Sequence, residues 1–504
     1  MTPLKTLVVA AFPLVLLPAA GGAQEAEAVR RRPAPTHGVR AESLLVRNVM
    51  VIRGNGTPAI GPTDVLVKGN VIESIGGFSR MQDAATEIDG TGKYLLPGFV
   101  NMHGHIQQER ARIPIPVEYQ MNLWLASGIT TIRDLGSELQ KSLEYREQSA
   151  RGEIVAPRIF LYPFCSGGRT PQEASEMVRR HKESGVSGLK LYSLDRDQMD
   201  AILAEAHKLG LPCTIHMGVE ETNAWDVVRL KFRSIEHWYG IPDAALPGLQ
   251  HFPAEFSYSN EVHRFRYAGR LWREADPLKL EKVLRAMVEA GVAWDPTLAI
   301  YEASRDLVRA QNQPWFKDYL HPALAKFFEP DLENHGSYFL GWTNTDEVYW
   351  KENYRIWMKA VLDFARMGGV VTTGEDAGFI YVMYGFGLLR EIELHEEAGF
   401  QPIECIQHAT FNGAKVLGES ERIGRVRVGH LADLIVVNGN PLENLHVLNP
   451  LGTTLCVDGK PVQGGGIEWT IKDGIPYHGP TLLAEVREIV AKAREGTTAV
   501  EGSR

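Results

Sequence analysis

Two histidines separated by one glycine, His103 and His105, are the residues that most strongly suggest chemistry. They end a largely apolar run, 95–105, that is typical of a buried strand. Side chains alternate faces along a strand, so both imidazoles point the same way and can bind one metal ion, while Gly104 lets the backbone come close. The pair alone is weak evidence, because polar residues also occur where any strand meets its loop. A metal site therefore requires further ligands elsewhere in the chain.

Four later apolar segments end in residues able to act as metal ligands, namely Lys190, His216, His237 and Asp376. Taken singly, each has a structural alternative. A histidine can be a hydrogen-bonded core residue, Lys190 a surface cation, and Asp376 the N-cap of the helix after it. Together they stand at the ends of the fourth, fifth, sixth and eighth predicted strands, with the histidine pair on the first. This repeated placement favours one shared site.

Strands that alternate with amphipathic helices must position these residues. Eight short apolar strands are predicted, at 95–105, 129–133, 159–162, 188–192, 212–216, 234–237, 293–298 and 370–373. Helices are predicted between them, among others at 119–126, 171–184, 198–209 and 277–290. This pattern predicts an α/β fold, a (β/α)₈ TIM-like barrel whose active site lies at the carboxyl ends of the strands. An open doubly wound sheet is the alternative, but no glycine-rich phosphate loop follows the first strand.

The barrel is predicted to span 94–419, and both flanks have the short alternating strands of a β-sheet. Segments 40–93 and 420–480 each offer too few strands for a stable core, so we expect them to form one small β-sandwich domain together. Residues 481–504 are predicted as a C-terminal helix and tail. Two long connections, 238–291 and 299–369, follow strand ends and are predicted lids or decorations of the site.

The first residues of the chain predict that the protein is exported from the cytoplasm. Lys5 precedes an apolar run at 7–17 and a stretch of small residues, so 1–23 is interpreted as a cleaved signal peptide and 24–39 as a disordered lead-in. A membrane helix is the alternative, but the run is shorter than the roughly 18 apolar residues required, and prolines interrupt it. A periplasmic or secreted protein is expected, with no stable membrane association after cleavage.

Composition and cysteines set further limits. The formal net charge is -9 and no Lys/Arg tract is sustained, which argues against nucleic-acid binding. Four cysteines lack the spacing of a metal site, and most are expected to be buried free thiols. They are Cys165, Cys213, Cys405 and Cys456.

With these residues in place, the chain resembles the amidohydrolase superfamily, and is similar to its secreted imidazolonepropionase-like and Xaa-Pro dipeptidase-like members. The resemblance covers nearly all of the mature chain. The motifs that carry it, besides the ligand residues above, lie at 97–105, 128–134, 374–378, 408–418 and 424–433.

The resemblance implies a two-metal site. It implies that His103, His105 and Asp376 bind one divalent metal, and that His216 and His237 bind a second. Imidazole-rich ligation favours zinc, while manganese, iron and cobalt stay open.

The resemblance further implies that Lys190, carboxylated by carbon dioxide, bridges the two metals. An ammonium has no lone pair to offer a cation, so a lysine in such a cluster must be modified, deprotonated or turned away. A mononuclear site is the alternative, with ligands His103, His105, His216 and Asp376.

The expected activity is hydrolysis of an amide C–N bond in a small molecule, a dipeptide or an N-acyl amino acid, by a metal-activated water. Asp376 is expected to accept a proton and return it to the leaving nitrogen. Tyr192 shares the inward face with Lys190 and is a candidate to hold the oxyanion or a substrate carboxylate, or else packs beneath the site. Alternatives are a cyclic-amide hydrolase, a deaminase, or a binding barrel without catalysis, which would lack ligands. The oligomeric state stays open.

Two further charged residues, Arg133 and Glu375, lie within these motifs. Arg133 is expected to pair structurally with Asp134 rather than with a substrate acid. Glu375 is an additional carboxylate beside Asp376, in a position where many relatives carry a small residue, and is a candidate to influence proton transfer or recognition.

Overall fold

The computed structural model describes residues 32–76, 84–192, 194–217, 221–248, 254, 256–257 and 260–501. The predicted signal peptide and most of the predicted lead-in lie outside the described residues. The end of that lead-in, 32–39, lies against the body of the protein, where Gly38 N donates a hydrogen bond to Pro476 O at 2.8 Å.

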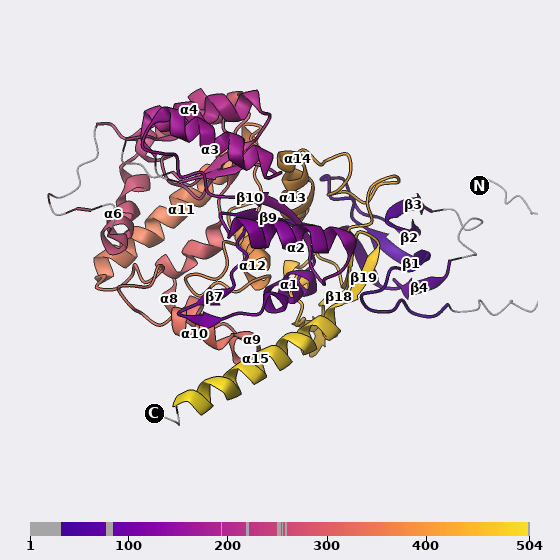
Figure 1. Ribbon diagram of the computed structural model, residues 1–504. Coiled ribbons are helices and arrows are strands. Elements are labelled where there is room, and N and C mark those ends of the chain that lie inside the picture. Colours follow the sequence, from indigo (N-terminus) through magenta and orange to yellow (C-terminus); the bar gives the residue numbers. More distant parts are fainter. Residues whose placement is uncertain are drawn as a thin grey trace, which may run out of the picture.

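Seven of the eight predicted barrel strands are strands in the structure, and every pairing between them is parallel. One sheet has the order β10-β9-β6 and the other the order β11-β12-β13-β14. Almost all of their residues are buried, as expected for parallel strands covered on both faces. Helices surround them in Figure 1. Their bounds are β6 (Phe99–Gly104), β9 (Ile129–Leu135), β10 (Arg158–Tyr162), β11 (Leu189–Leu191), β12 (Cys213–Ile215), β13 (Ser234–Glu236) and β14 (Ala293–Asp295).

The eighth predicted strand, 370–373, is reduced to a single parallel bridge between Val371 and Trp294 of β14. On its other side Met102 N, in β6, donates to Thr373 O at 2.9 Å. The segment thus lies between β14 and β6, although it is not a regular strand.

The two sheets meet at Lys190 of β11. Its N–H donates to Pro163 O at 3.0 Å, and its carbonyl accepts from Cys165 N at 2.8 Å. Phe164, between these two residues, forms a parallel bridge with Lys190. The sequence order of the strands around this array is that of a TIM-like barrel.

Helices occupy the connections, and the sequence marks where they begin and end. Thr170 caps α3 by accepting a hydrogen bond from Glu173 N, and Gly291 ends α7 with a φ of 72°. The four helices predicted by range agree with α1, α3, α4 and α7 to within two residues at each end. The helices with ten or more residues around the strands are α1 (Val117–Ala126), α2 (Leu139–Arg151), α3 (Pro171–Glu183), α4 (Arg196–Lys208), α6 (Glu261–Glu274), α7 (Pro277–Ala290), α11 (Asn344–Arg366) and α12 (Phe386–Glu397). Shorter ones are α5 (Ala224–Leu230), α8 (Leu307–Gln311), α9 (Phe316–Tyr319), α10 (Pro322–Phe327), α13 (Pro402–Gln407) and α14 (Gly413–Leu417).

One sheet of eight strands, in the order β19-β18-β15-β5-β1-β2-β3 with β4 paired to β1, combines strands from both flanking segments with β5 (Lys93–Pro97). Residues 95–97 of the predicted first barrel strand, 95–105, thus belong to this sheet, and β6 forms the barrel part. The N-terminal and C-terminal segments meet where β5 pairs with β15. A separate hydrophobic cluster, which includes Val46, Val65 and Ile471, forms the core of this small domain. The bounds are β1 (Ser43–Val51), β2 (Ile60–Lys68), β3 (Val71–Ile75), β4 (Thr86–Asp89), β5 (Lys93–Pro97), β15 (Leu434–Asn438), β18 (Ile467–Lys472) and β19 (Ile475–His478).

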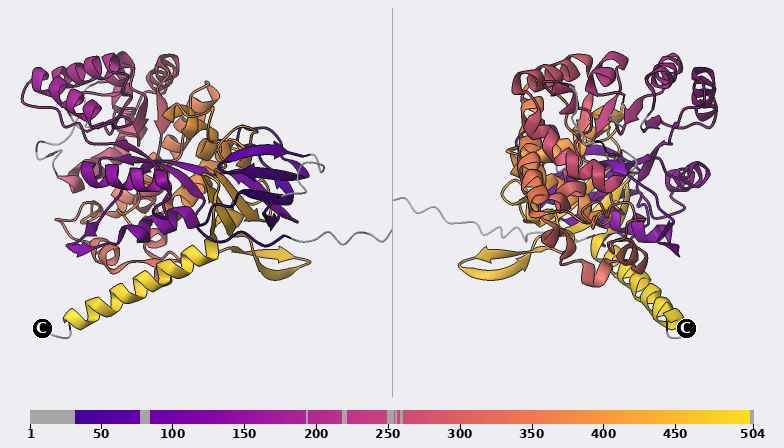
Figure 2. Two further views of the ribbon diagram at one scale, coloured as in Figure 1. Left: turned by 45° about the vertical axis from the view of Figure 1, so that its right-hand side comes forward. Right: turned by 90° about the vertical axis from the view of Figure 1, so that its left-hand side faces the viewer.

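Two features extend from this body in Figure 2. A hairpin of β16 (Thr453–Val457) and β17 (Lys460–Gly464) turns at Asp458 and Gly459, both of which have a positive φ. The C-terminal helix α15 (Gly479–Glu501) packs against α1 along part of its length. Among the described residues, no helix combines the length and apolar character needed to span a membrane. All four cysteines are free thiols, and three of them are buried.

Candidate metal centre

All residues predicted for the site line one cavity of about 350 Å³. Each stands at or just beyond the carboxyl end of a barrel segment, where successive parallel strands bring their last residues to one side. The set comprises His103, His105, Lys190, Tyr192, His216, His237 and Asp376. Their convergence comes from strands that are up to 270 residues apart in sequence, so local structure alone does not explain it.

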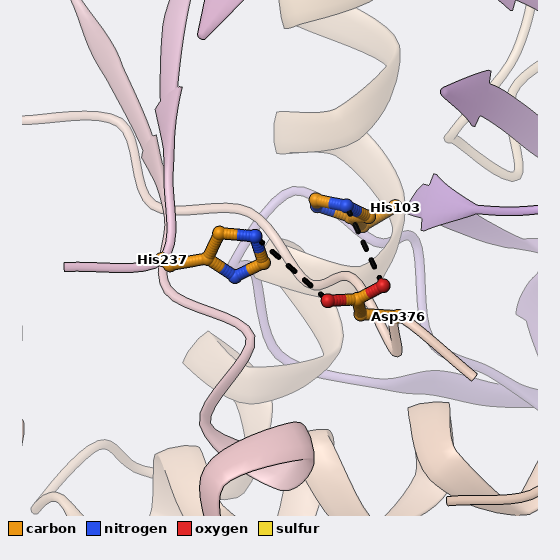
Figure 3. Close-up of side chains that lie close together, drawn as sticks. All are labelled: His103, His237 and Asp376. Carbon is orange, nitrogen blue, oxygen red and sulfur yellow. Dashed lines mark ion pairs between the residues drawn. The ribbon is translucent and has the colours of Figure 1, made fainter. Parts of the chain in front are cut away.

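Asp376 lies at the centre of the histidines. Its Oδ1 lies 3.0 Å from His105 Nε2 and 3.7 Å from His103 Nε2, and its Oδ2 lies 3.8 Å from His237 Nε2. His103, His237 and Asp376 each place one possible ligand atom within 4.8 Å of the others. Figure 3 shows the two imidazoles pointing toward the carboxylate. This spacing is short enough for the three residues to belong to one metal centre.

His216 joins the group through ring contacts. Its imidazole centroid lies 4.6 Å from that of His237, and the His237 ring lies 4.8 Å from that of His103. The ring of His216 also stacks on Tyr239, at 4.6 Å and 29°. The imidazoles therefore form a continuous series along the cavity floor, with His216 at one end.

The backbone at two of these positions is strained. His237 has a φ of 62° and Asp376 a φ of 48°, in the left-handed region that residues with a Cβ rarely adopt. Barrel strands hold both residues there, since His237 N donates to Asp295 O at 2.8 Å and Asp376 N donates to His103 O at 2.9 Å. Strain of this kind, fixed by surrounding hydrogen bonds, is common at functional sites.

Burial keeps three of the histidines, His103, His216 and His237, neutral. It lowers the pKa of His103 to about 4, with a further contribution from the Lys190 ammonium. Burial also holds the pKa of His216 and of His237 well below the usual range. A neutral imidazole offers a lone pair, which is the form that a metal ion requires.

Asp376 is the anionic partner of these rings. Burial by itself raises the pKa of its carboxyl, but the nearby His103, His105 and His237 outweigh that effect and hold it well below its ordinary value. The site therefore combines neutral nitrogen ligands with one carboxylate, a donor set suited to a divalent transition metal.

Lys190 has the environment that carboxylation would require. Its side chain is buried, and its Nζ has no hydrogen-bond partner among the described residues. Burial lowers the pKa of this amine to about 8, so a larger share is neutral than in an exposed lysine. A buried amine that lines the cavity beside the imidazoles, without a hydrogen-bond partner among the described residues, is compatible with a carbamate at this position.

Glu236 supports the site from beneath, and sequence reasoning missed it. Its carboxylate lies 3.0 Å from His103 Nδ1, and it accepts hydrogen bonds from Arg133 Nη2 at 2.7 Å and from Ser234 Oγ at 2.8 Å. The Nδ1–H bond directs His103 Nε2 toward Asp376, as carboxylates do for many metal-binding histidines. The sequence feature that could have identified Glu236 is its position directly before His237.

Arg133 is structural, as expected, but its partner is different. Its guanidinium bonds to Glu236 and to Met102 O at 2.6 Å, while the Asp134 carboxylate accepts from Ser137. Adjacent residues on a strand face opposite sides, which is why the predicted pair with Asp134 does not form.

Glu375 also turns away from the cavity. Its carboxylate accepts hydrogen bonds from Trp124 Nε1, from Gly385 N at 2.7 Å and from Leu388 N at 3.2 Å. The last two donors belong to the first turn of α12. Glu375 thus holds a helix terminus in place, and a direct part in proton transfer or recognition, considered above, does not fit this position.

Tyr192 lies at the cavity mouth with 40% of its surface exposed. Its ring lies 4.7 Å from that of His216, and Arg264 Nη1 is 3.4 Å from its hydroxyl. It is therefore a wall of the cavity and not a residue packed beneath the site.

This chain is similar in sequence to known proteins. It is 28% identical over 151 residues to a dihydroorotase from Thermoanaerobacter sp. (strain X514), a match covering 29% of this chain and 34% of that enzyme. It is 21% identical over 455 residues to a 5'-deoxyadenosine deaminase from Methanothermobacter thermautotrophicus, covering 86% of this chain and 92% of the relative. The chain thus spans about a third of the length of the first enzyme and most of the second.

The fold is shared with solved structures. A crystal structure of a Xaa-Pro dipeptidase with bound methionine aligns with a TM-score of 0.60 at 20% identity, over 86% of this chain and 100% of the other. At this identity the likeness concerns the fold, a TIM-like barrel with α/β content. The model of the Amidohydrolase family matches residues 94–309 and 344–462, which contain every residue predicted for the site. The chain therefore belongs to the Amidohydrolase family.

Proposed function

We propose that this protein is a metal-dependent hydrolase that cleaves an amide C–N bond in a small molecule, a dipeptide or an N-acyl amino acid. The observation that carries the proposal is the convergence on a single cavity of four histidines, one carboxylate and one lysine whose Nζ has no hydrogen-bond partner among the described residues. Family membership supports the reaction class. The small volume of the cavity supports a small substrate.

We further propose that the site holds two zinc ions. His103, His105 and Asp376 would bind one, His216 and His237 the other, and carboxylated Lys190 would bridge them. When bound, the metals would supply Lewis acidity toward the carbonyl and lower the pKa of water. The donor set supports zinc, although it does not exclude other transition metals.

The chain's own residues would divide the remaining work. Asp376, anionic and adjacent to three imidazoles, would take a proton from the attacking water and deliver it to the leaving nitrogen. Tyr192 would contact the substrate at the cavity mouth. Glu236 would keep His103 in the orientation that its Nε2 requires.

The proposal is tested with purified protein loaded with zinc and offered a panel of dipeptides, including Xaa-Pro, and N-acyl amino acids. We expect release of a free amino acid that stops on chelation and returns with added metal. His446→Ala, which changes an exposed histidine far from the ligand motifs, should retain this activity. Ammonia release without amide cleavage would instead support the deaminase alternative, which the deaminase relative favours.

Four structural and cellular expectations accompany this proposal. We propose that the segment 370–373 completes a closed eight-membered barrel, supported by the Met102 to Thr373 bond, and that the small domain is a sandwich. The domain limits at 93/94 and 419/420 also stay proposals. Export to a periplasm or the exterior rests on the apolar run at 7–17, and N-terminal sequencing of the secreted protein would test it.

A further inference from the structure

One end of the cavity is formed by the loop that follows the last predicted metal ligand. Phe379 and Ile380 of this loop line the cavity. His105 marks the same end of the imidazole series, opposite His216, since its ring lies 5.2 Å from that of His103. The ring of Phe379 stands edge-on to the His105 imidazole, with centroids 5.8 Å apart and an angle of 83°. This end therefore presents hydrocarbon directly beside a predicted metal ligand.

The backbone of this loop is strained. Ile380 has a φ of 46° and Tyr381 a φ of 65°, in the left-handed region that a β-branched residue such as isoleucine almost never adopts. Two hydrogen bonds close the loop, from Gly378 N to Val382 O at 2.9 Å and from Val382 N to Phe379 O at 2.8 Å. A glycine at position 380 would remove the strain, but it would also remove a side chain from the cavity. Strain of this kind clusters where ligands bind, so it marks the loop as part of a binding site.

Packing behind the two side chains holds this wall in place. The Arg110 guanidinium lies 4.5 Å from the centre of the Phe379 ring, and the Phe327 ring lies 6.0 Å from it. At Ile380 the chain approaches so closely that a Cβ on Gly336 would lie 2.9 Å from Ile380 Cγ1. None of these three supporting residues lines the cavity. The wall therefore resists displacement by a larger group, because its outer side is already packed.

The opposite end of the imidazole series has a different character. The rings of Tyr192 and Tyr239 lie 4.7 Å and 4.6 Å from that of His216, and both carry hydroxyl groups. A charged, polar half of a substrate fits this end, whereas an uncharged apolar half fits the end at Phe379 and Ile380. In an N-acyl amino acid the amine half carries the carboxylate. Its acyl chain would therefore lie against Phe379 and Ile380.

Charges near this end disfavour an acyl half with a free ammonium, which a dipeptide has. Asp376 is the only carboxylate among the described residues that line the cavity, and three imidazoles already surround it. Arg110 places a guanidinium against Phe379, and the Nδ1 of His335 is engaged by Glu261 at 2.7 Å. An ammonium at this end would lie near a cation without a carboxylate of its own.

We propose that Phe379 and Ile380 bind the acyl group of the substrate and limit its length. This inference rests on the proposed function and narrows it. The substrate is an N-acyl amino acid whose acyl half is short and uncharged, and it is not a dipeptide. Hydrolysis adds water across the amide and releases a short carboxylic acid and a free amino acid. Phe379 is then a specificity-determining residue, because its ring stands where a longer chain would extend.

The first test uses full-length, zinc-loaded enzyme and two compounds that differ in chain length, N-butanoyl-L-leucine and N-octanoyl-L-leucine. We expect kcat/KM to be at least about tenfold higher for the butanoyl compound, since the longer chain would have to displace the wall. Phe379→Ala should reduce this ratio to less than about threefold, mainly by raising kcat/KM for the octanoyl compound. Phe411→Ala is the matched control and should keep the wild-type ratio. Phe411 is also half-buried, lies 5.4 Å from the Arg425 guanidinium and does not line the cavity.

A second comparison tests the charge of the acyl half. N-butanoyl-L-leucine and L-2-aminobutanoyl-L-leucine differ only in the ammonium, and we expect kcat/KM to be at least about tenfold higher for the uncharged compound. Equal or faster cleavage of the dipeptide overturns the restriction to N-acyl amino acids. If Phe379→Ala changes only the discrimination between N-butanoylglycine and N-butanoyl-L-leucine, the assignment of this wall to the acyl half is overturned.

Binding measurements separate this inference from the proposed function. Calorimetry with butanoate and octanoate reports on the wall without turnover, and circular dichroism confirms that each variant is folded. If no amide is cleaved but Phe379→Ala strengthens octanoate binding relative to butanoate, the proposed function fails and the acyl site stands. If amides are cleaved but Phe379→Ala leaves the ratio for the two chain lengths unchanged, or the wild type shows no preference, the acyl site is overturned. Absence of both effects overturns both proposals.

Discussion

At the scale of single residues, Lys190 and Lys472 form an instructive pair. Both are buried, and burial lowers the pKa of each to about 8. Lys472 Nζ nevertheless donates to Ser149 O at 2.7 Å, whereas Lys190 Nζ has no partner among the described residues. Burial is thus common to the hydrogen-bonded Lys472 and to Lys190, the lysine proposed to hold metal. The missing hydrogen bond is what distinguishes Lys190.

If Lys190 bridges two metals as proposed, Lys190→Met should leave one metal per chain where we expect two in the wild type. We expect kcat/KM to fall by at least about 100-fold, because a second metal and its Lewis acidity are lost. Lys472→Met serves as the matched control and should keep both metals. Elemental analysis of the purified proteins measures the stoichiometry. A Lys190→Met protein with full activity and an unchanged metal content would exclude the bridging role.

Loading of the site should depend on pH through Lys190. With a pKa of about 8, roughly 3% of the amine is neutral at pH 6.5 and roughly half at pH 8. Only the neutral amine reacts with carbon dioxide, so at a fixed concentration of dissolved carbon dioxide the reconstitution of the metal-free protein with zinc should be about 15-fold faster at pH 8 than at pH 6.5. The lowered pKa of His103, His216 and His237 keeps those ligands neutral at both values. Equal rates of metal uptake at the two pH values would contradict this prediction.

At the scale of elements, Glu236 ties together three strands of the barrel. It lies on β13 and contacts Arg133 of β9 and His103 of β6. Glu236→Gln keeps the size but removes the charge, and we expect zinc affinity to fall 10- to 100-fold in a chelator competition assay. The free energy of unfolding should also fall by about 3 kcal/mol, because the buried Arg133 loses the negative charge of Glu236. Glu205→Gln, whose carboxylate pairs with Arg179 away from the site, should retain wild-type zinc affinity.

The junction of α12 with the site depends on Glu375. Glu375→Ala leaves the Trp124 indole and two N–H groups of the α12 terminus without an acceptor, and should cost about 2–4 kcal/mol in denaturant unfolding. The metal content should be unchanged, because Glu375 does not line the cavity. Glu396→Ala, exposed on the same helix, should change stability by less than about 0.5 kcal/mol. Loss of metal from a folded Glu375→Ala protein would show that Glu375 has a second role.

For the whole molecule, the alternation of strands and helices could be predicted from the sequence because each parallel strand is short, apolar and buried. That pattern located His216 and His237 at strand ends, and the structure brings them to the same cavity. It failed at 370–373, where only Val371 forms a bridge, because the chain there turns into the strained conformation of Asp376.

Side-chain contacts across the barrel could not be predicted from the sequence. The pairing of Arg133 with Glu236 depends on which side chains meet in the interior, and strand alternation fixes only the face of each residue. Arg264 was missed for a related reason. It enters the cavity from a helix inside a long connection, where neither strand order nor spacing predicts its position.

The small sheet has a consequence for how the chain folds during synthesis. Its strand β5 pairs on one side with β1 and on the other with β15, so the N-terminal strands cannot complete their sheet until residues beyond 434 have been made. During the synthesis of the barrel, one edge of β5 is therefore without its partner strand. Such long-range pairing slows folding and makes the unfinished chain prone to association. A chain without its last 70 residues would keep the whole sequence of the barrel. Its N-terminal strands, however, would lack the C-terminal strands that complete their sheet.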